Sequence, residues 1–166
     1  MGALPHSGTG GLDGVAGPVM ALDVGERRIG VAISDPLRVL ATPIATLLRR
    51  SWDEDLAAIT HLVRERGVTL ILVGHPLNMD GSAGEQARRS ERFARRLAEA
   101  LGAGGPSVIL WDERLSTQTA EERLRVGESV GRAGLDAVAA AVFLQEWLDT
   151  QRGPALFPPE MRGAEE

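Results

Sequence analysis

The chain has 166 residues, 43% of them hydrophobic and 25% charged, the proportions of an ordinary globular domain. These values exclude a chain that is disordered or fibrous throughout, and the length is enough to bury a full core. The chain has no cysteine, which excludes disulfides, thiolate metal sites and a cysteine nucleophile and suits a reducing compartment, so we expect a cytoplasmic protein. The net charge of −5 argues against nucleic-acid binding through bulk charge.

The basic residues are all arginines, with no lysine among them. A guanidinium pairs with phosphate through two hydrogen bonds, so this bias suits a protein that binds phosphate groups. A GC-rich coding sequence explains the same composition, and the bias alone therefore identifies no ligand.

Domain boundaries are expected near the two ends of the chain. Residues 1–17 are rich in glycine and lack both a basic start and an apolar run, which predicts a flexible leader rather than a signal peptide or membrane anchor. Prolines at positions 154, 158 and 159 predict a flexible tail over residues 151–166. Residues 18–150 contain no linker and no internal repeat, which predicts a single domain.

The first half of this domain has the pattern of a strand-rich unit. Residues 19–24 and 28–34 are apolar stretches joined by a Gly-Glu-Arg turn, which predicts a β-hairpin. Residues 39–47 predict a third strand, and Pro43 predicts that it lies at a sheet edge because proline cannot donate to the ladder. Residues 51–66 predict a helix that begins with a Ser-Trp-Asp-Glu capping pattern and ends at Gly67.

The second half alternates strands and helices. Residues 68–74 form a continuous apolar run, which is typical of a strand buried in the centre of a sheet. Residues 85–101 predict an amphipathic helix, 107–111 a buried strand, 117–126 a short polar helix and 135–148 an apolar helix. This order of elements predicts an α/β fold in which helices cover a mixed sheet.

Three carboxylates stand where a charge is unexpected. Asp23 lies inside the first predicted strand, Glu113 follows a buried strand, and Asp136 opens the apolar helix. Each would be costly to bury alone, whereas together they would form an oxygen-lined site for Mg²⁺ or Mn²⁺. Structural alternatives stay open: Asp136 as a helix N-cap, Asp23 as a support for the turn at Gly25, and Glu113 as the partner of a surface arginine.

Four segments carry these acids and the loops around them. They are Leu22–Asp35 (LDVGERRIGVAISD), Val73–Ser82 (VGHPLNMDGS), Asp112–Thr117 (DERLST) and Leu135–Ala140 (LDAVAA). In this order they resemble the YqgF/RuvX family of Holliday junction resolvases and pre-16S rRNA nucleases, which belongs to the ribonuclease H-like superfamily. The resemblance runs from residue 19 to residue 149.

The resemblance implies a ribonuclease H-like fold, a five-stranded mixed sheet whose first three strands are antiparallel, with helices on both faces. It also implies a catalytic and metal-binding site made of Asp23, Glu113 and Asp136, with Mg²⁺ or Mn²⁺ as the cofactor. Asp112 stays open as a substitute for Glu113. His75, in the loop after the central strand, is a further candidate for assisting proton transfer.

The implied activity is hydrolysis of a phosphodiester bond in structured nucleic acid by a metal-bound water. The family is associated with resolving Holliday junctions in DNA and with processing the 5′ end of pre-16S rRNA, and the sequence does not choose between them. Two symmetric cuts in a four-way junction require a homodimer, whereas trimming RNA needs only one active site. No membrane partner is expected.

Substrate contacts are expected from the hairpin turn after Asp23, the residue after Glu113, the loop that opens the helix at residue 85, and one face of that helix. Helix N-terminal amides bind anions, and arginines on one face form a path for the phosphate backbone, although glutamates on the same helix leave open a plain solvated face. The few aromatic residues disfavour base stacking. The nucleic-acid-binding candidates are Arg27, Arg28, Asn78, Ser82, Arg88, Arg92 and Arg114.

Two functions of other classes stay open. Asp23-Val24-Gly25 followed by a strand also resembles the first phosphate loop of actin and sugar-kinase ATP-binding domains, although those proteins close two domains around the nucleotide and this chain has room for one. A nucleic-acid-binding factor that has kept the fold without turnover is the other, and the presence of all three acids argues against it.

Overall fold

The computed structural model describes residues 17–115 and 134–152. Residues 1–16 of the predicted leader, the predicted polar helix at 117–126 and residues 153–166 of the predicted tail lie outside this part of the chain. Residue 151, the first of the predicted tail, is the last residue of a helix. The elements are β1 (Val19–Val24), β2 (Arg28–Ser34), β3 (Ala41–Leu48), α1 (Trp52–Arg66), β4 (Leu70–His75), α2 (Glu85–Leu101), β5 (Ser107–Asp112), the 3₁₀ turn η1 (Glu113–Leu115) and α4 (Leu135–Gln151).

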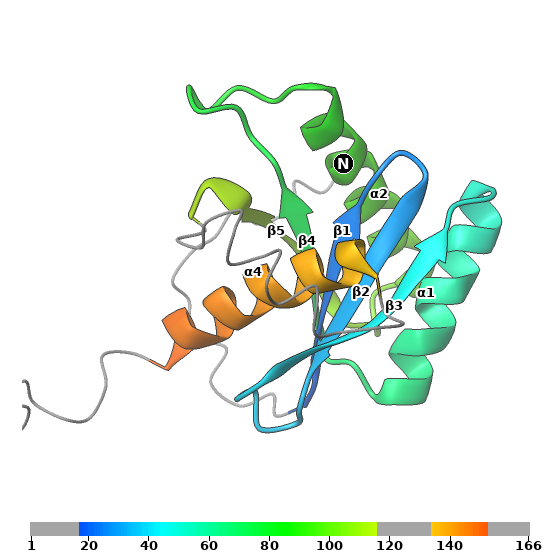
Figure 1. The fold of residues 1–166 in the computed structure, drawn as a ribbon. Coiled ribbons are helices and arrows are strands. Elements are labelled where there is room, and N and C mark those ends of the chain that lie inside the picture. Colours follow the sequence, from blue (N-terminus) through cyan, green and yellow to red (C-terminus); the bar gives the residue numbers. More distant parts are fainter. Residues whose placement is uncertain (1–16, 116–133, 153–166) are drawn as a thin grey trace, which may run out of the picture.

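The strands form one five-stranded sheet in the order β3-β2-β1-β4-β5 (Figure 1). β1, β2 and β3 pair antiparallel, while β4 is parallel to both β1 and β5. The predicted mixed sheet with three antiparallel strands first is therefore confirmed, and so is the edge position of β3, the strand that contains Pro43.

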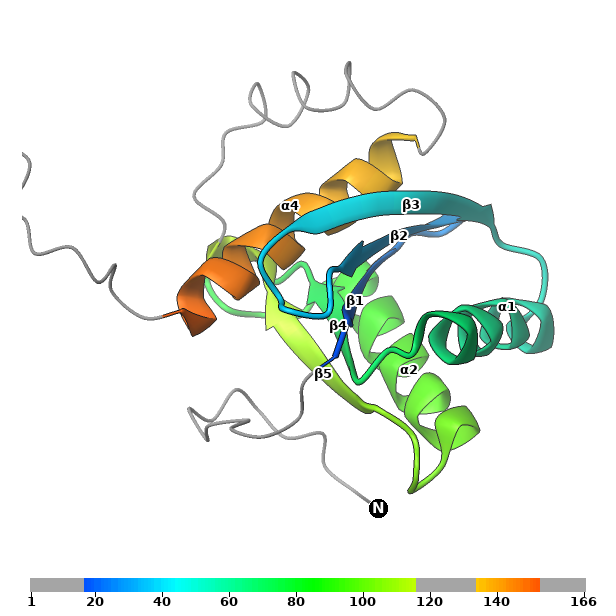
Figure 2. The same cartoon turned by 90° about the horizontal axis from the view of Figure 1, so that it is seen from below.

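Side chains alternate between two hydrophobic layers, because successive residues of a strand point to opposite faces. Met20, Leu22 and Val24 pack with α1 and α2, whereas Val19 and Ala21 pack with α4. Figure 2 shows α4 on one face of the sheet and the other two helices on the opposite face. Any polar residue on a strand is thus assigned to the α4 face or to the α1–α2 face by its position in the alternation.

Local hydrogen bonds explain where the observed elements differ from the predicted ones. β3 begins at residue 41 rather than 39, because the Asp35 carboxylate accepts from the backbone N–H groups of Val39 and Leu40 and holds them in a turn. β4 begins at residue 70 rather than 68, because the Val68 N–H closes the end of α1 by donating to Val63 O. The predicted cap is confirmed, since Ser51 accepts from the Glu54 N–H.

No helix among residues 17–115 and 134–152 is long and apolar enough to cross a membrane.

Candidate active site

Asp23 is half-buried near the end of β1, on the face that α4 covers. Val19 and Ala21 face α4, so Asp23, two positions further on, faces the same way. Its antiparallel partner on β2 is Gly30. On the other side, β1 pairs with β4 up to Leu22 and Val73, and the next step brings Gly74 alongside. Asp23 therefore lies between two residues that have no side chain.

Gly30 admits the first turn of α4. A Cβ atom at Gly30 would overlap the carbonyl oxygen of Asp136 and lie 2.6 Å from the backbone nitrogen of Ala137. The helix backbone thus rests directly on β2, next to Asp23. The Asp136 carboxylate accepts a hydrogen bond from Arg28 Nε at 3.1 Å, since Arg28 lies two positions before Gly30 on the same face of the strand.

Asp136 is not the N-cap of α4. The N-cap is Gly134, two residues earlier, and it makes no side-chain capping hydrogen bond. The N-cap interpretation of Asp136 is therefore wrong. The residue lies in the first turn, where a negative charge also interacts favourably with the helix dipole.

Gly74 provides the corresponding space on β4. A Cβ atom at Gly74 would overlap Glu113 Oε1 and lie 3.1 Å from Phe143 Cε1 of α4. The Glu113 carboxylate therefore lies over Gly74 on the α4 face. Glu113 reaches this position because η1 turns the chain immediately after β5 ends at Asp112.

Asp23, Glu113 and Asp136 thus lie on the same face at the same end of the sheet, carried by β1, η1 and α4. Their oxygen atoms are the ligands that Mg²⁺ and Mn²⁺ prefer, so the chemistry of the donor set fits such an ion. The two glycines let Asp136 and Glu113 approach Asp23 over the sheet. Within residues 17–115 and 134–152, however, no three acidic, histidine or cysteine side chains are gathered closely enough to hold a metal. The Asp136 carboxylate is instead paired with Arg28.

Asp112 and His75 lie on the opposite face of the sheet. They are neighbours in the β4–β5 ladder, and Val73, two positions before His75, packs in the layer that faces α1 and α2. His75 Nε2 lies 2.8 Å from Glu91 Oε1 on α2. These positions support neither the substitution of Asp112 for Glu113 nor a role for His75 in proton transfer at the acids.

Arg114 is held by groups of the protein itself. Its guanidinium contacts both carboxylate oxygens of Asp112, with Nη2 at 2.7 Å from Oδ2, and Nη1 donates to Asn78 O at 3.4 Å. The hydrogen bonds from Arg114 hold the pKa of the Asp112 carboxyl below its ordinary value. Arg114 therefore connects the end of β5 to the loop between β4 and α2.

Asn78 and Ser82 are likewise engaged within that loop. Asn78 Nδ2 donates to Ser82 Oγ at 3.0 Å, and the Ser82 hydroxyl donates to Asp80 Oδ1 at 2.6 Å. The hydrogen bond from the Ser82 hydroxyl is the main cause of the lowered pKa of Asp80. These contacts shape the loop before α2 rather than present free donors to a ligand.

The other predicted nucleic-acid-binding arginines are exposed. Arg27 and Arg28 lie in and after the β1–β2 turn, and Arg28 pairs with Asp136, one of the three acids. Arg88 and Arg92 lie on α2, which covers the opposite face of the sheet, and Arg92 pairs with Glu85 at 3.1 Å.

Two pairs of residues near the site were missed by reasoning from the sequence. Gly30 and Gly74 carry a signal that could have found them, because a glycine inside a strand often marks close approach of another backbone or group. Arg49, whose guanidinium donates to Gly25 O, and its partner Asp55 carry no local signal, because their contacts join separate elements.

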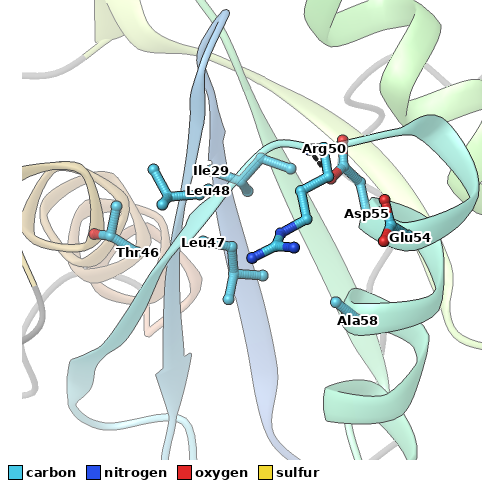
Figure 3. A pocket seen from close by; sticks show the side chains of 8 residues that line it. All are labelled: Ile29, Thr46, Leu47, Leu48, Arg50, Glu54, Asp55 and Ala58. Carbon is cyan, nitrogen blue, oxygen red and sulfur yellow. Dashed lines mark hydrogen bonds between the residues drawn. The ribbon is translucent and has the colours of Figure 1, made fainter.

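The structure also has a hollow of about 370 Å³ on the other side of the molecule. Figure 3 shows that it lies between the end of β3 and the first turns of α1, with the Arg50 side chain extending into it. Ile29 and Leu47 in its wall belong to the layer that faces α1 and α2. The sheet therefore separates this hollow from the three acids.

The sequence is similar to bacterial proteins that are provisionally named pre-16S rRNA nucleases. One from Synechococcus sp. is 45% identical over 141 residues, which cover 83% of this chain and 93% of that protein. One from Myxococcus xanthus is 46% identical over 138 residues, covering 81% of this chain and 89% of that protein.

The fold is similar to that of RuvC from Thermus thermophilus. The structure of that protein in complex with a Holliday junction substrate matches with a TM-score of 0.57 at 14% sequence identity, covering 82% of this chain and 96% of that chain. The family model described as RuvX, Holliday junction resolvase, matches residues 17–150. Because this match spans nearly the whole described domain, the chain belongs to the RuvX family.

Proposed function

We propose that this protein is a metal-dependent endonuclease that hydrolyses a phosphodiester bond in structured RNA, with the 5′ end of precursor 16S rRNA as its substrate. The observation that carries the proposal is the position of Asp23, Glu113 and Asp136 on one face at one end of the sheet. The names of relatives that are 45% and 46% identical support the choice of RNA.

The three carboxylates would hold Mg²⁺ or Mn²⁺. When bound, such an ion supplies Lewis-acid stabilisation of the phosphate and lowers the pKa of a water molecule. The protein's own part is to keep three oxygen donors on one side of a rigid sheet. Asp23 lies on β1. Asp136 lies on α4, whose backbone contacts Gly30, and the Glu113 carboxylate lies over Gly74.

Arg28 is the residue that would present the substrate phosphate to the acids. Its side chain is 59% exposed and yet lies 3.1 Å from the Asp136 carboxylate. A guanidinium in that position can pair with a phosphate oxygen through its remaining N–H groups. Its positive charge also offsets part of the repulsion between the phosphate and the carboxylates.

A second candidate is resolution of Holliday junctions in DNA, which the description of the matched family favours. This reaction requires two symmetric cuts and therefore two copies of the site, whereas RNA trimming requires one. The number of protein copies on the substrate thus distinguishes the two functions.

The proposal predicts that Asp23→Asn, Glu113→Gln and Asp136→Asn each lower cleavage by about 100-fold or more, because each removes a ligand of an ion worth several kcal/mol to the transition state. Cleavage is measured on a precursor rRNA that retains its 5′ leader and on a mobile four-way DNA junction, with Mg²⁺ or Mn²⁺. Glu99→Gln, at an exposed position near the end of α2, is the matched control.

Several outcomes would contradict the proposal. Cleavage by these variants at the wild-type rate would show that the three acids take no part in the reaction. Cleavage of the junction alone, by a protein that binds it as a dimer, would favour the resolvase function. If the wild-type protein binds either nucleic acid but does not cleave it, the result would favour a nucleic-acid-binding factor without catalytic activity.

A further inference from the structure

The turn between β1 and β2 joins the strand that carries Asp23 to the strand that carries Arg28. Inside the turn, the Gly25 N–H donates to Arg28 O at 2.8 Å, and residues 26–28 are exposed to solvent. The position of the turn relative to the rest of the protein therefore depends on contacts from outside it. Arg49, the residue after β3, makes two such contacts.

Arg49 holds the turn with both its backbone and its side chain. Its N–H donates to Arg27 O at 2.8 Å. Its guanidinium Nη1 donates to Gly25 O at 3.1 Å. Two carbonyl groups at opposite ends of the turn are thus fixed by one residue.

The Arg49 side chain is itself held in place. Nε donates to Asp55 Oδ2 at 3.1 Å, and the two side chains are only 14% and 6% exposed. The guanidinium carbon lies 5.2 Å from the centre of the Trp52 ring and 5.6 Å from that of Phe93. A largely buried guanidinium with a carboxylate partner and two aromatic neighbours has little freedom to move.

Asp55 is anchored in turn to the start of α1. Its Oδ1 accepts from the Arg50 N–H at 3.1 Å, and its own N–H donates to Ser51 O at 2.9 Å. Figure 3 shows Asp55 in the first turns of α1, with this hydrogen bond to Arg50 drawn as a dashed line. The contacts therefore run without a break from α1 through Asp55 and Arg49 to the β1–β2 turn.

We infer that Arg49 is a positioning residue for the proposed nuclease: it fixes the β1–β2 turn against α1 and thereby holds Arg28 beside Asp136. The inference rests on the proposed function. Arg49 acts through the turn, and none of its contacts described above is to the three acids. Lysine cannot replace it, because one ammonium group cannot bond Asp55 and Gly25 in the way that the Nε and Nη1 atoms of one guanidinium do.

The first test measures the turn itself, without reference to activity. In Arg49→Lys and Arg49→Met, the hydrogen bond from the guanidinium to Gly25 O is lost, whereas the backbone bond to Arg27 O stays. We therefore expect exchange of the Gly25 amide hydrogen, which bonds to Arg28 O, to be at least about tenfold faster than in the wild type. Arg96→Met is the matched control, because Arg96 stacks on the same Trp52 ring at 4.2 Å but lies on α2. Unchanged exchange in both Arg49 variants would overturn the inference.

The second test asks whether Arg49 acts through Arg28. We expect Arg49→Lys to lower kcat about tenfold in the wild-type background and less than twofold in an Arg28→Met background, because interacting residues show non-additive effects. Equal effects in the two backgrounds would overturn the inference. Arg49→Lys keeps a positive charge opposite Asp55, so this variant serves if Arg49→Met does not fold.

Failure of the proposed function gives a different result from failure of this inference. A wild-type protein that cleaves neither substrate would overturn the nuclease function, and with it this role in a reaction. The exchange measurement would then still decide whether Arg49 fixes the turn. Normal cleavage by Arg49 variants with a mobile turn would overturn the positioning role alone.

Discussion

Two residues without side chains allow the acids of the candidate site to approach one another. Gly30 and Gly74 flank Asp23 on the two neighbouring strands. The space that a side chain at Gly30 would fill is taken by the backbone of Asp136, and the space at Gly74 by the carboxylate of Glu113. A larger residue at either position would move one acid away from Asp23.

The two glycines should respond differently to alanine. Gly30→Ala meets helix backbone, which cannot rotate away, so we expect a loss of about 1–3 kcal/mol in the free energy of unfolding together with loss of cleavage. Gly74→Ala meets mainly the end of a flexible glutamate, so we expect a smaller loss of stability and at least a tenfold loss of cleavage. Denaturant unfolding and the cleavage assay measure the two effects.

Gly104→Ala is the control for both substitutions, because a Cβ atom there meets nothing within 4 Å. Normal cleavage by Gly74→Ala would show that the position of Glu113 over Gly74 does not matter to the reaction.

Among the elements, the end of β5 and the loop between β4 and α2 form one connected unit. Arg114 joins them by contacting Asp112 on one side and Asn78 O on the other. Asp112, the ion-pair partner of Arg114, lies on the α1–α2 side of the sheet, while Glu113, between these two residues in sequence, lies on the α4 side. Arg114 thus helps to set the path of η1, which delivers Glu113 to its position.

This ion pair predicts a particular dependence of stability on pH. Hydrogen bonds from Arg114 lower the pKa of Asp112 in the folded protein. Asp112 therefore contributes stability that is complete above its unfolded pKa of about 3.9 and is lost as the pH falls through the lower folded pKa. We expect Asp112→Asn to reduce the loss of stability that the wild type shows below about pH 4.

Urea unfolding from pH 6 down to pH 3 tests this expectation, with Asp53→Asn at an exposed position in the first turn of α1 as the control. If the free energy of unfolding falls with pH in parallel for the wild type and Asp112→Asn, the Asp112–Arg114 ion pair does not contribute to the pH dependence of stability.

At the scale of the whole molecule, the net charge of −5 conceals a local arrangement of charges. Acids gather at the end of the sheet where β1 and β4 finish, and arginines of the β1–β2 turn and of the first turn of α2 lie at the same end. Cations at the acids and arginines around them would leave this end attractive to phosphate even though the chain as a whole is acidic.

The affinity for nucleic acid should therefore fall steeply as the salt concentration rises. Arginines at the end of the sheet that holds the acids should contribute to this dependence, whereas arginines at the other end should not. Arg88 is in the first turn of α2, and Arg64 is in the last turn of α1, near the start of β4. We expect Arg88→Gln to reduce the slope of log K against log salt by about 1, and Arg64→Gln to leave it unchanged. Filter binding or fluorescence anisotropy across a salt series measures the slopes, and equal slopes would exclude a phosphate contact at Arg88.

Much of the fold follows from local patterns in the sequence. Alternating apolar residues, the Ser51 cap and the glycine after α1 act over a few positions, so the strands and helices within residues 17–115 and 134–152 were predicted with errors confined to their ends. The motifs around Asp23, Glu113 and Asp136 identified the family, and Pro43 placed β3 at an edge because a missing N–H has the same consequence in any fold.

Only the tertiary structure decided how these residues work together. Arg28 and Asp136 are 108 positions apart and meet because α4 rests on Gly30. Strand alternation and the turn at η1 put Asp112 and Glu113 on opposite faces, and Arg114, predicted to contact substrate, is engaged by Asp112 and Asn78 O. The sequence by itself determined which of the described elements form and to which family the chain belongs, since both are carried by patterns of nearby residues. Which groups meet depends on register and packing between distant segments, and these are set only when the whole chain folds.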